Sequence, residues 1–102
     1  MHPLGILTLT FNTTTMLSGS QVNLNPRFFF NLLEGLEQTE ALHTEKLSDT
    51  AEIHLMKNNS TGEYYIFELG GEYDDDYFYC FFTENEAVEY FETRLDQAST
   101  EL

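Results

Sequence analysis

The residues best suited to chemistry form a run of acids that follows a glycine pair. Glu72-Tyr73-Asp74-Asp75-Asp76 comes directly after Gly70-Gly71, where a turn is expected. Ca²⁺ binds about six to eight oxygen ligands, and carboxylates supply them well. The alternating acids, central glycine and closing glutamate of an EF-hand loop are absent from this run, however. In an extended chain Asp74 and Asp76 point to one side and Asp75 to the other.

Three interpretations of this acidic loop, residues 72–76, remain open. The loop keeps a hairpin soluble, or it belongs to a recognition surface for a basic partner, or it binds a cation. In the last case the ion is expected to be Ca²⁺ and the ligands are expected to be Glu72, Asp74, Asp75 and Asp76.

A second set of acids has the spacing of one helix face. Its members are Glu86, Glu89, Glu92 and Asp96. Residues three or four apart on a helix have Cβ atoms about 5–6 Å apart. Phosphates of B-DNA advance about 3.4 Å each along one strand, and their real separation is larger because the strand winds. Together with Asp74 and Asp76, this row would imitate a phosphate backbone; the alternative is an ordinary solvated helix face.

The other reactive residue types form no catalytic pattern. His2, His43 and His54 are far apart in the sequence and lack metal-ligand spacing. Cys80 lies in an apolar run, where burial raises the pKa of a thiol and lowers its reactivity. Acids are so numerous that no single pair indicates general acid–base catalysis. We therefore expect a protein that is not an enzyme and that has no cofactor, apart from the Ca²⁺ alternative.

The net charge of the chain favours a protein partner of opposite sign. Its 102 residues include 18 acidic and 4 basic ones, which gives a formal net charge of −14. Small soluble domains are well served by a net charge of about 2–8 in magnitude. The negative field disfavours direct contact with nucleic acid or with an anionic membrane, because both are polyanions. Basic proteins and cations are the partners that it attracts.

Composition indicates a folded, cytoplasmic protein. Hydrophobic residues make up 41% of the chain and aromatic residues 15%, which argues against intrinsic disorder. A single cysteine excludes an internal disulfide and fits a reducing compartment. Thr8, Thr10 and Asn12 interrupt the N-terminal apolar run, which therefore does not resemble a signal peptide. No apolar segment reaches the roughly 20 residues that cross a bilayer.

Hydrophobic periodicity predicts most of the strands. Short runs with alternating apolar positions indicate strands at 4–15, 21–24, 51–57 and 63–69, and a continuous apolar run indicates another at 77–82. Residues 58–62 are expected to join two of them as a hairpin. The run 77–82 is apolar on both faces, which is typical of a central strand or of a strand with one docking face.

Capping signals predict two helices. The first begins at Asn25-Pro26 and runs to about Gln38, and residues 39–49 either extend it or form a looser piece. The second begins after Thr83, which forms a capping box with Glu86, and ends before a frayed tail at 97–102. The expected fold is a single α+β domain, residues 1–102, with the order β(β)αβββα. Both helices are expected on one face of an antiparallel sheet.

In size, charge and aromatic content the chain resembles small acidic inhibitors, such as immunity proteins that neutralise nuclease toxins and phage proteins that block host nucleases. The resemblance is compositional and involves no motif. It implies an intracellular inhibitor of the nuclease-immunity, anti-defence or DNA-mimic type that occludes a basic, nucleic-acid-handling protein. The expected binding residues are Glu72, Tyr73, Asp74, Asp75, Asp76, Tyr77, Glu86, Glu89, Glu92 and Asp96.

Three alternatives to this inhibitor hypothesis stay open. One is a calcium-binding or calcium-buffering protein that uses the loop 72–76. Another is a homodimer in which the aromatic strand 77–82 pairs with itself. The third is an acidic surface that serves solubility or adaptation to a salty cytosol.

Overall fold

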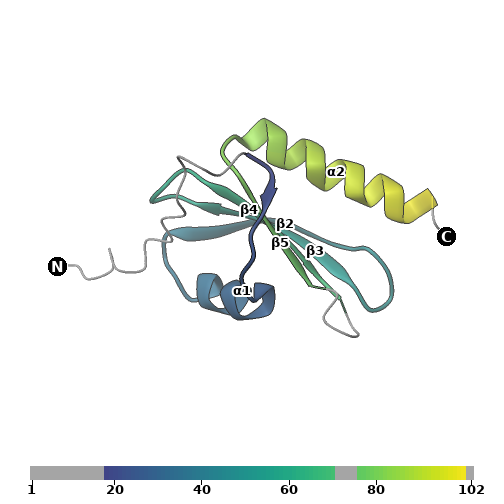
Figure 1. Cartoon of the computed structure of the whole chain (residues 1–102), viewed down its shortest axis with the longest axis horizontal. Helices are drawn as coiled ribbons and strands as arrows, with labels where there is room; N and C mark the ends of the chain where they lie inside the picture. Colours follow the sequence, from purple (N-terminus) through teal and green to yellow (C-terminus); the bar gives the residue numbers. More distant parts are fainter. Residues whose placement is uncertain (1–17, 71–75, 101–102) are drawn as a thin grey trace.

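A computed structural model describes residues 18–70 and 76–100 of the chain (Figure 1). In chain order its elements are β1 (Ser20–Gln21), α1 (Pro26–Glu34), β2 (Thr39–Lys46), β3 (Glu52–Asn58), β4 (Tyr64–Leu69), β5 (Tyr77–Phe81) and α2 (Glu84–Thr100). The five strands form one antiparallel sheet in the order β1-β5-β4-β3-β2. The predicted α+β class and antiparallel sheet are confirmed. The predicted strand at 4–15 lies outside the described residues.

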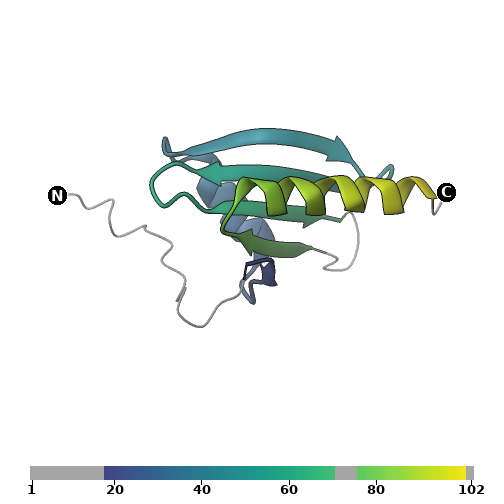
Figure 2. The same ribbon diagram turned by 90° about the horizontal axis from the view of Figure 1, so that it is seen from above.

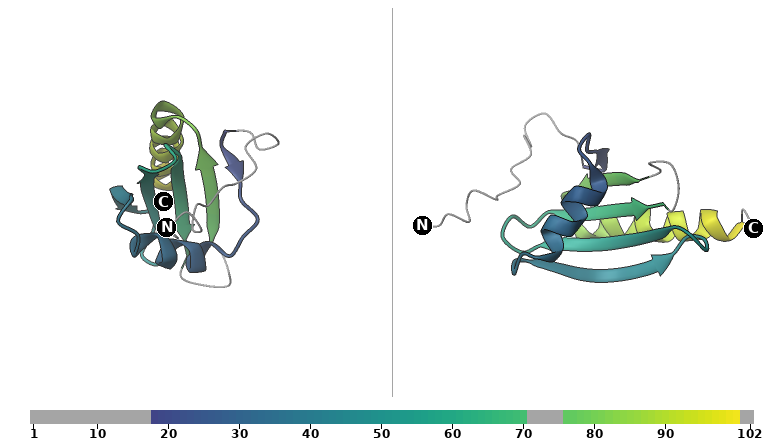
Figure 3. Two further views of the ribbon diagram at one scale, coloured as in Figure 1. Left: turned by 90° about the vertical axis from the view of Figure 1, so that its left-hand side faces the viewer. Right: turned by 90° about the horizontal axis from the view of Figure 1, so that it is seen from below.

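The two helices cover opposite faces of the sheet, with α2 above and α1 below in Figure 1 and in the left view of Figure 3. Alternate residues of β4 show why. Phe67 belongs to the core cluster that contains Leu33 of α1, whereas Ile66 belongs to the cluster that contains Phe91 of α2. Every residue of β4 is buried, so both faces of the strand need a cover. This corrects the expectation that both helices pack on one face.

Residues 39–49, which were expected either to extend the first helix or to form a looser piece, contain instead the edge strand β2. Helix α1 ends at Glu34, with Gly35 as its C-cap, and β2 then pairs with β3. The pairing register shifts between Ala41 and His43, which is the mark of a β-bulge. The bulge and the exposure of most β2 side chains disrupt the period-two pattern, so the sequence does not reveal the strand.

The predicted helix starts and the predicted hairpin are confirmed. The side chain of Asn25 accepts a hydrogen bond from the backbone N–H of Phe28 at 3.0 Å. Thr83 Oγ1 accepts one from the backbone N–H of Glu86 at 3.3 Å. Gly62 closes the β3–β4 hairpin at φ +81°, a conformation that favours glycine. Helix α2 includes residues 97–100, which were expected to be a frayed tail.

The core on the α1 side is aromatic. Phe67 and Phe78 stack with ring centroids 4.3 Å apart, and Tyr65 meets Phe78 edge-on at 5.7 Å. The hydroxyl of Tyr65 donates to Glu63 at 3.0 Å, so this buried polar group is satisfied. Cys80 lies in the same cluster, where burial raises the pKa of its thiol to about 12. The prediction of a buried cysteine is confirmed.

Candidate protein-binding site

Helix α2 is fixed to the sheet by an apolar stripe and by an ion pair. Ala87 and Phe91 are buried against the sheet, as predicted. Beside them Arg94 donates from Nε and Nη2 to the two oxygens of Glu68, at 3.0 and 3.3 Å. The hydroxyl of Tyr90 donates to the same carboxylate at 2.9 Å. These contacts fix the rotation of α2, which runs along the sheet in Figure 2 and presents its other side to solvent.

The solvent side of α2 carries Glu89, Glu92 and Asp96, which we call the acidic outer face. All three residues are exposed. Their spacing of three and four residues places them on one side of the helix, as predicted.

The bases of the chain are engaged elsewhere. Arg27 pairs with Asp76 at 3.1 Å, Lys46 lies 4.0 Å from Glu52, Lys57 lies over the ring of Tyr64, and Arg94 pairs with Glu68. These four are all the lysines and arginines of the chain. Within the described part of the chain, therefore, no ion pair neutralises the acidic outer face.

Glu86 belongs to the predicted acidic row but has a different role. Its Oε1 accepts hydrogen bonds from Ser18 at 2.5 Å and from Thr83 at 2.9 Å. The bond from Ser18 first, and then the bond from Thr83, lower the pKa of this exposed carboxyl. Ser18 also accepts a bond from the backbone N–H of Phe82 at 3.0 Å. Glu86 therefore caps α2 and ties it to the segment before β1.

Asp76 is the one predicted member of the acidic loop that the structure describes. Its carboxylate accepts bonds from Arg27 Nε and Nη2 at 3.2 and 3.1 Å, and from the backbone N–H of Gly70 at 2.8 Å. Arg27 Nη2 also donates to the carbonyl of Gly70 at 2.9 Å. Asp76 thus joins the end of β4 to α1. Glu72, Tyr73, Asp74 and Asp75 lie outside the described residues.

An aromatic row runs along the α2 side of β5. Tyr77, at 40% exposure, stacks on Tyr79 with centroids 6.4 Å apart. Tyr90 of α2 packs on this row, 5.0 Å from Tyr79 and 5.4 Å from Phe81. Only Tyr77 was among the predicted binding residues. The alternation of 77, 79 and 81 was the signal for a row on one face.

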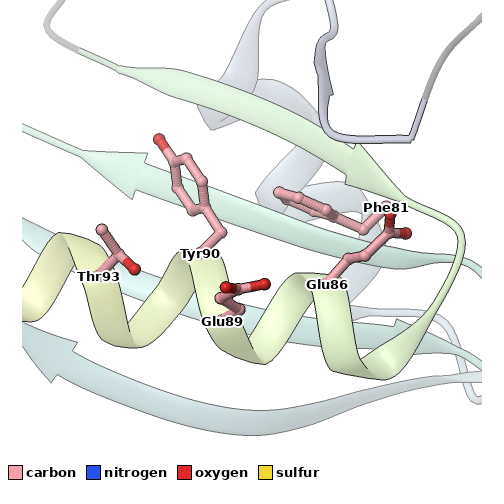
Figure 4. A pocket seen from close by; sticks show the side chains of 5 residues that line it. All are labelled: Phe81, Glu86, Glu89, Tyr90 and Thr93. Atoms are coloured by element: carbon pink, nitrogen blue, oxygen red, sulfur yellow. The ribbon is translucent and has the colours of Figure 1, made fainter.

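Between this row and α2 lies an open groove of about 340 Å³, which we call the α2–β5 groove (Figure 4). Its lining residues are Phe81, Glu86, Glu89, Tyr90 and Thr93. Figure 4 shows the rings of Phe81 and Tyr90 on the sheet side and the carboxylate of Glu89 on the helix. The groove adjoins the acidic outer face, because Glu89 belongs to both.

Residues 18–70 and 76–100 contain no group of three or more His, Cys, Asp or Glu side chains that could hold a metal ion. His54 instead contacts Thr44 at 3.0 Å and Glu52 at 3.1 Å. Most of the ligands expected for Ca²⁺ lie outside this part of the chain, and Asp76 is bound to Arg27.

No family model, curated protein or solved structure matches the chain. The helices within the described ranges are too short or too polar to cross a membrane.

Proposed function

We propose that the protein binds a basic, nucleic-acid-handling protein through the acidic outer face of α2 and occludes its nucleic-acid site. The observation that carries the proposal is the exposure of Glu89, Glu92 and Asp96 on one helix face while every lysine and arginine of the chain is engaged elsewhere. Uncompensated charge on one face steers a partner of opposite charge and orients it.

A nucleic-acid-handling partner fits this face better than an arbitrary basic protein. A site for nucleic acid presents lysines and arginines in a row along the phosphate path. The outer face offers a row of carboxylates at about 5–6 Å intervals between Cβ atoms. The net charge of −14 disfavours contact with the nucleic acid itself. The protein would thus compete with nucleic acid for the partner.

The attachment of α2 also supports binding. Glu68, Arg94 and Tyr90 hold the helix on the sheet, so its outer acids stand on a fixed backbone. A surface that is ordered before binding loses less conformational entropy on association. The chain is therefore suited to present an ordered acidic surface to its partner.

A competition experiment tests this function. A panel of purified basic nucleases and nucleic-acid-binding domains is titrated with the full chain, with and without duplex DNA. At least one panel member should bind, lose its nucleic acid as the chain is added, and lose affinity for the chain as salt rises. If every panel protein that binds the chain also binds duplex DNA at the same time, the occlusion model is wrong.

Two matched triple variants locate the surface. Glu89→Gln/Glu92→Gln/Asp96→Asn removes three charges from the outer face, and Glu37→Gln/Glu45→Gln/Asp49→Asn removes three from exposed positions outside α2. We expect the first variant to weaken binding about tenfold or more and the second about twofold or less. Equal losses would show that net charge, and not this face, controls binding.

A further inference from the structure

We infer that the α2–β5 groove receives an arginine side chain of the basic partner. The inference rests on the proposed function and deepens it, because it names the group that anchors the partner beside the acidic outer face. An arginine combines a planar cation with an apolar stem, and the groove offers aromatic rings and carboxylates together.

The aromatic side of the groove suits a guanidinium plane. The ring centroids of Phe81 and Tyr90 lie 5.4 Å apart, and the ring of Tyr79 packs on Tyr90 with centroids 5.0 Å apart. The bond from its hydroxyl to Glu68 fixes the orientation of the Tyr90 ring. Guanidinium groups bind to aromatic faces within about 6 Å of the ring centroid, and arginine does so more often than lysine.

The helix side of the groove supplies the opposite charge. Glu89 is exposed, and among the described residues it has no ion-pair partner. Glu86 stands one turn earlier, with Oε1 held by Ser18 and Thr83, and these bonds keep its carboxyl ionised to lower pH. A guanidinium can bind one carboxylate with two parallel N–H···O bonds while its plane lies on a ring.

Charge complementarity selects this occupant over others. A neutral apolar side chain would cover the two carboxylates without satisfying them, which is unfavourable. A metal ion would need more oxygen ligands than one helix turn provides. In addition, Glu86 Oε1 already accepts hydrogen bonds from two hydroxyl groups. A lysine would satisfy the charge but lacks the planar fork that matches both ring and carboxylate.

The test is a titration of the full, isotope-labelled chain with N-acetyl-arginine-N-methylamide, followed by amide NMR shifts. The neutral citrulline analogue serves as the isosteric control. We expect saturable shifts that concentrate at Phe81, Glu89, Tyr90 and Thr93 with the arginine compound, at millimolar affinity because the groove is open. Equal shifts with the citrulline compound, or shifts spread evenly along α2, would overturn the inference.

Two variant pairs make the titration specific. Glu89→Gln should weaken binding of the arginine compound about threefold to tenfold, whereas Glu84→Gln removes a charge from the same helix outside the groove and should leave it unchanged. Thr93→Arg should fill the groove and abolish the shifts, whereas Ser99→Arg adds the same charge elsewhere on α2. Equal effects within either pair would contradict the inference.

The two failures are distinguishable. If the outer-face triple variant loses the partner but the arginine compound never perturbs the groove, the proposed function stands and this inference is wrong. If the arginine compound binds the groove but no panel protein depends on the outer face, the proposed function is wrong and this inference falls with it.

Discussion

The two sides of α2 use the same acidic chemistry in opposite ways. Toward the sheet, the carboxylate of Glu68 is buried and accepts hydrogen bonds from Arg94 and Tyr90. Toward solvent, Glu89 and Asp96 form no ion pair with a basic side chain among the described residues. A carboxylate that is buried with its arginine makes the fold sensitive to the loss of either partner, whereas one that is exposed without a base contributes charge for a partner. The difference predicts opposite responses to substitution.

Removal of Arg94 should have the largest effect on stability. Arg94→Met leaves the buried Glu68 carboxylate with Tyr90 as its one donor among the described residues, which should lower the free energy of unfolding by about 2–4 kcal/mol. Urea denaturation measures the loss. Adding Glu68→Gln to Arg94→Met should restore part of it, because the unpaired charge is removed. A loss below about 0.5 kcal/mol would erase the distinction between the two sides of α2.

Asp76 should behave like Glu68, though with a smaller effect. Asp76→Asn weakens the bonds to Arg27 and to the backbone N–H of Gly70, so we expect a loss of about 1 kcal/mol. Arg27 is half exposed, so solvent screening limits the effect. Asp49→Asn, an exposed control, should be neutral. If both variants unfold alike, Asp76 does not join the end of β4 to α1.

Glu86 should make the free energy of unfolding depend on pH. Its pKa is lowered in the folded state, so its contribution is complete above the unfolded glutamate pKa of about 4.3 and is lost as pH falls through the folded value. The stability gap between the wild-type chain and Glu86→Gln should therefore close as the pH falls below the unfolded value of about 4.3. Glu84→Gln is the control in the same helical turn. A gap that widens in acid would contradict the bonds from Ser18 and Thr83.

The calcium alternative makes the loop, and not α2, the functional acid cluster. Because Asp76 is bound to Arg27, the informative variant is Glu72→Gln/Asp74→Asn/Asp75→Asn, which keeps that ion pair intact. On our account, calorimetric titration with Ca²⁺ in the presence of Mg²⁺ gives no saturable micromolar binding for the wild-type chain or the variant. If the wild-type chain binds Ca²⁺ saturably and the variant does not, the loop, and not α2, is the functional acid cluster.

Local signals in the sequence predicted much of the fold. The caps at Asn25 and Thr83 and the turn at Gly62 depend on residues close in the chain, so their residue types suffice. Strand β2 was missed because a bulge after Ala41 breaks its alternation. The arrangement of the helices depends on how two apolar faces of β4 are covered, which periodicity alone does not decide.

The candidate site was predictable only where it depends on helical spacing. The acidic outer face follows directly from the positions of Glu89, Glu92 and Asp96. The partners of Asp76 and Glu68 lie 49 and 26 residues away in sequence, and many acids compete for few bases, so neither ion pair could be assigned in advance. The α2–β5 groove likewise forms only when α2 packs beside β5.

The association rate of the matched triple variants tests the central claim most directly. For a panel protein that the chain displaces from duplex DNA, stopped-flow mixing is performed at several salt concentrations. We predict that Glu89→Gln/Glu92→Gln/Asp96→Asn slows association about tenfold at low salt and flattens the salt dependence, while Glu37→Gln/Glu45→Gln/Asp49→Asn stays within about twofold of wild type. Equal slowing by the two variants would show that the outer face of α2 is not the binding surface.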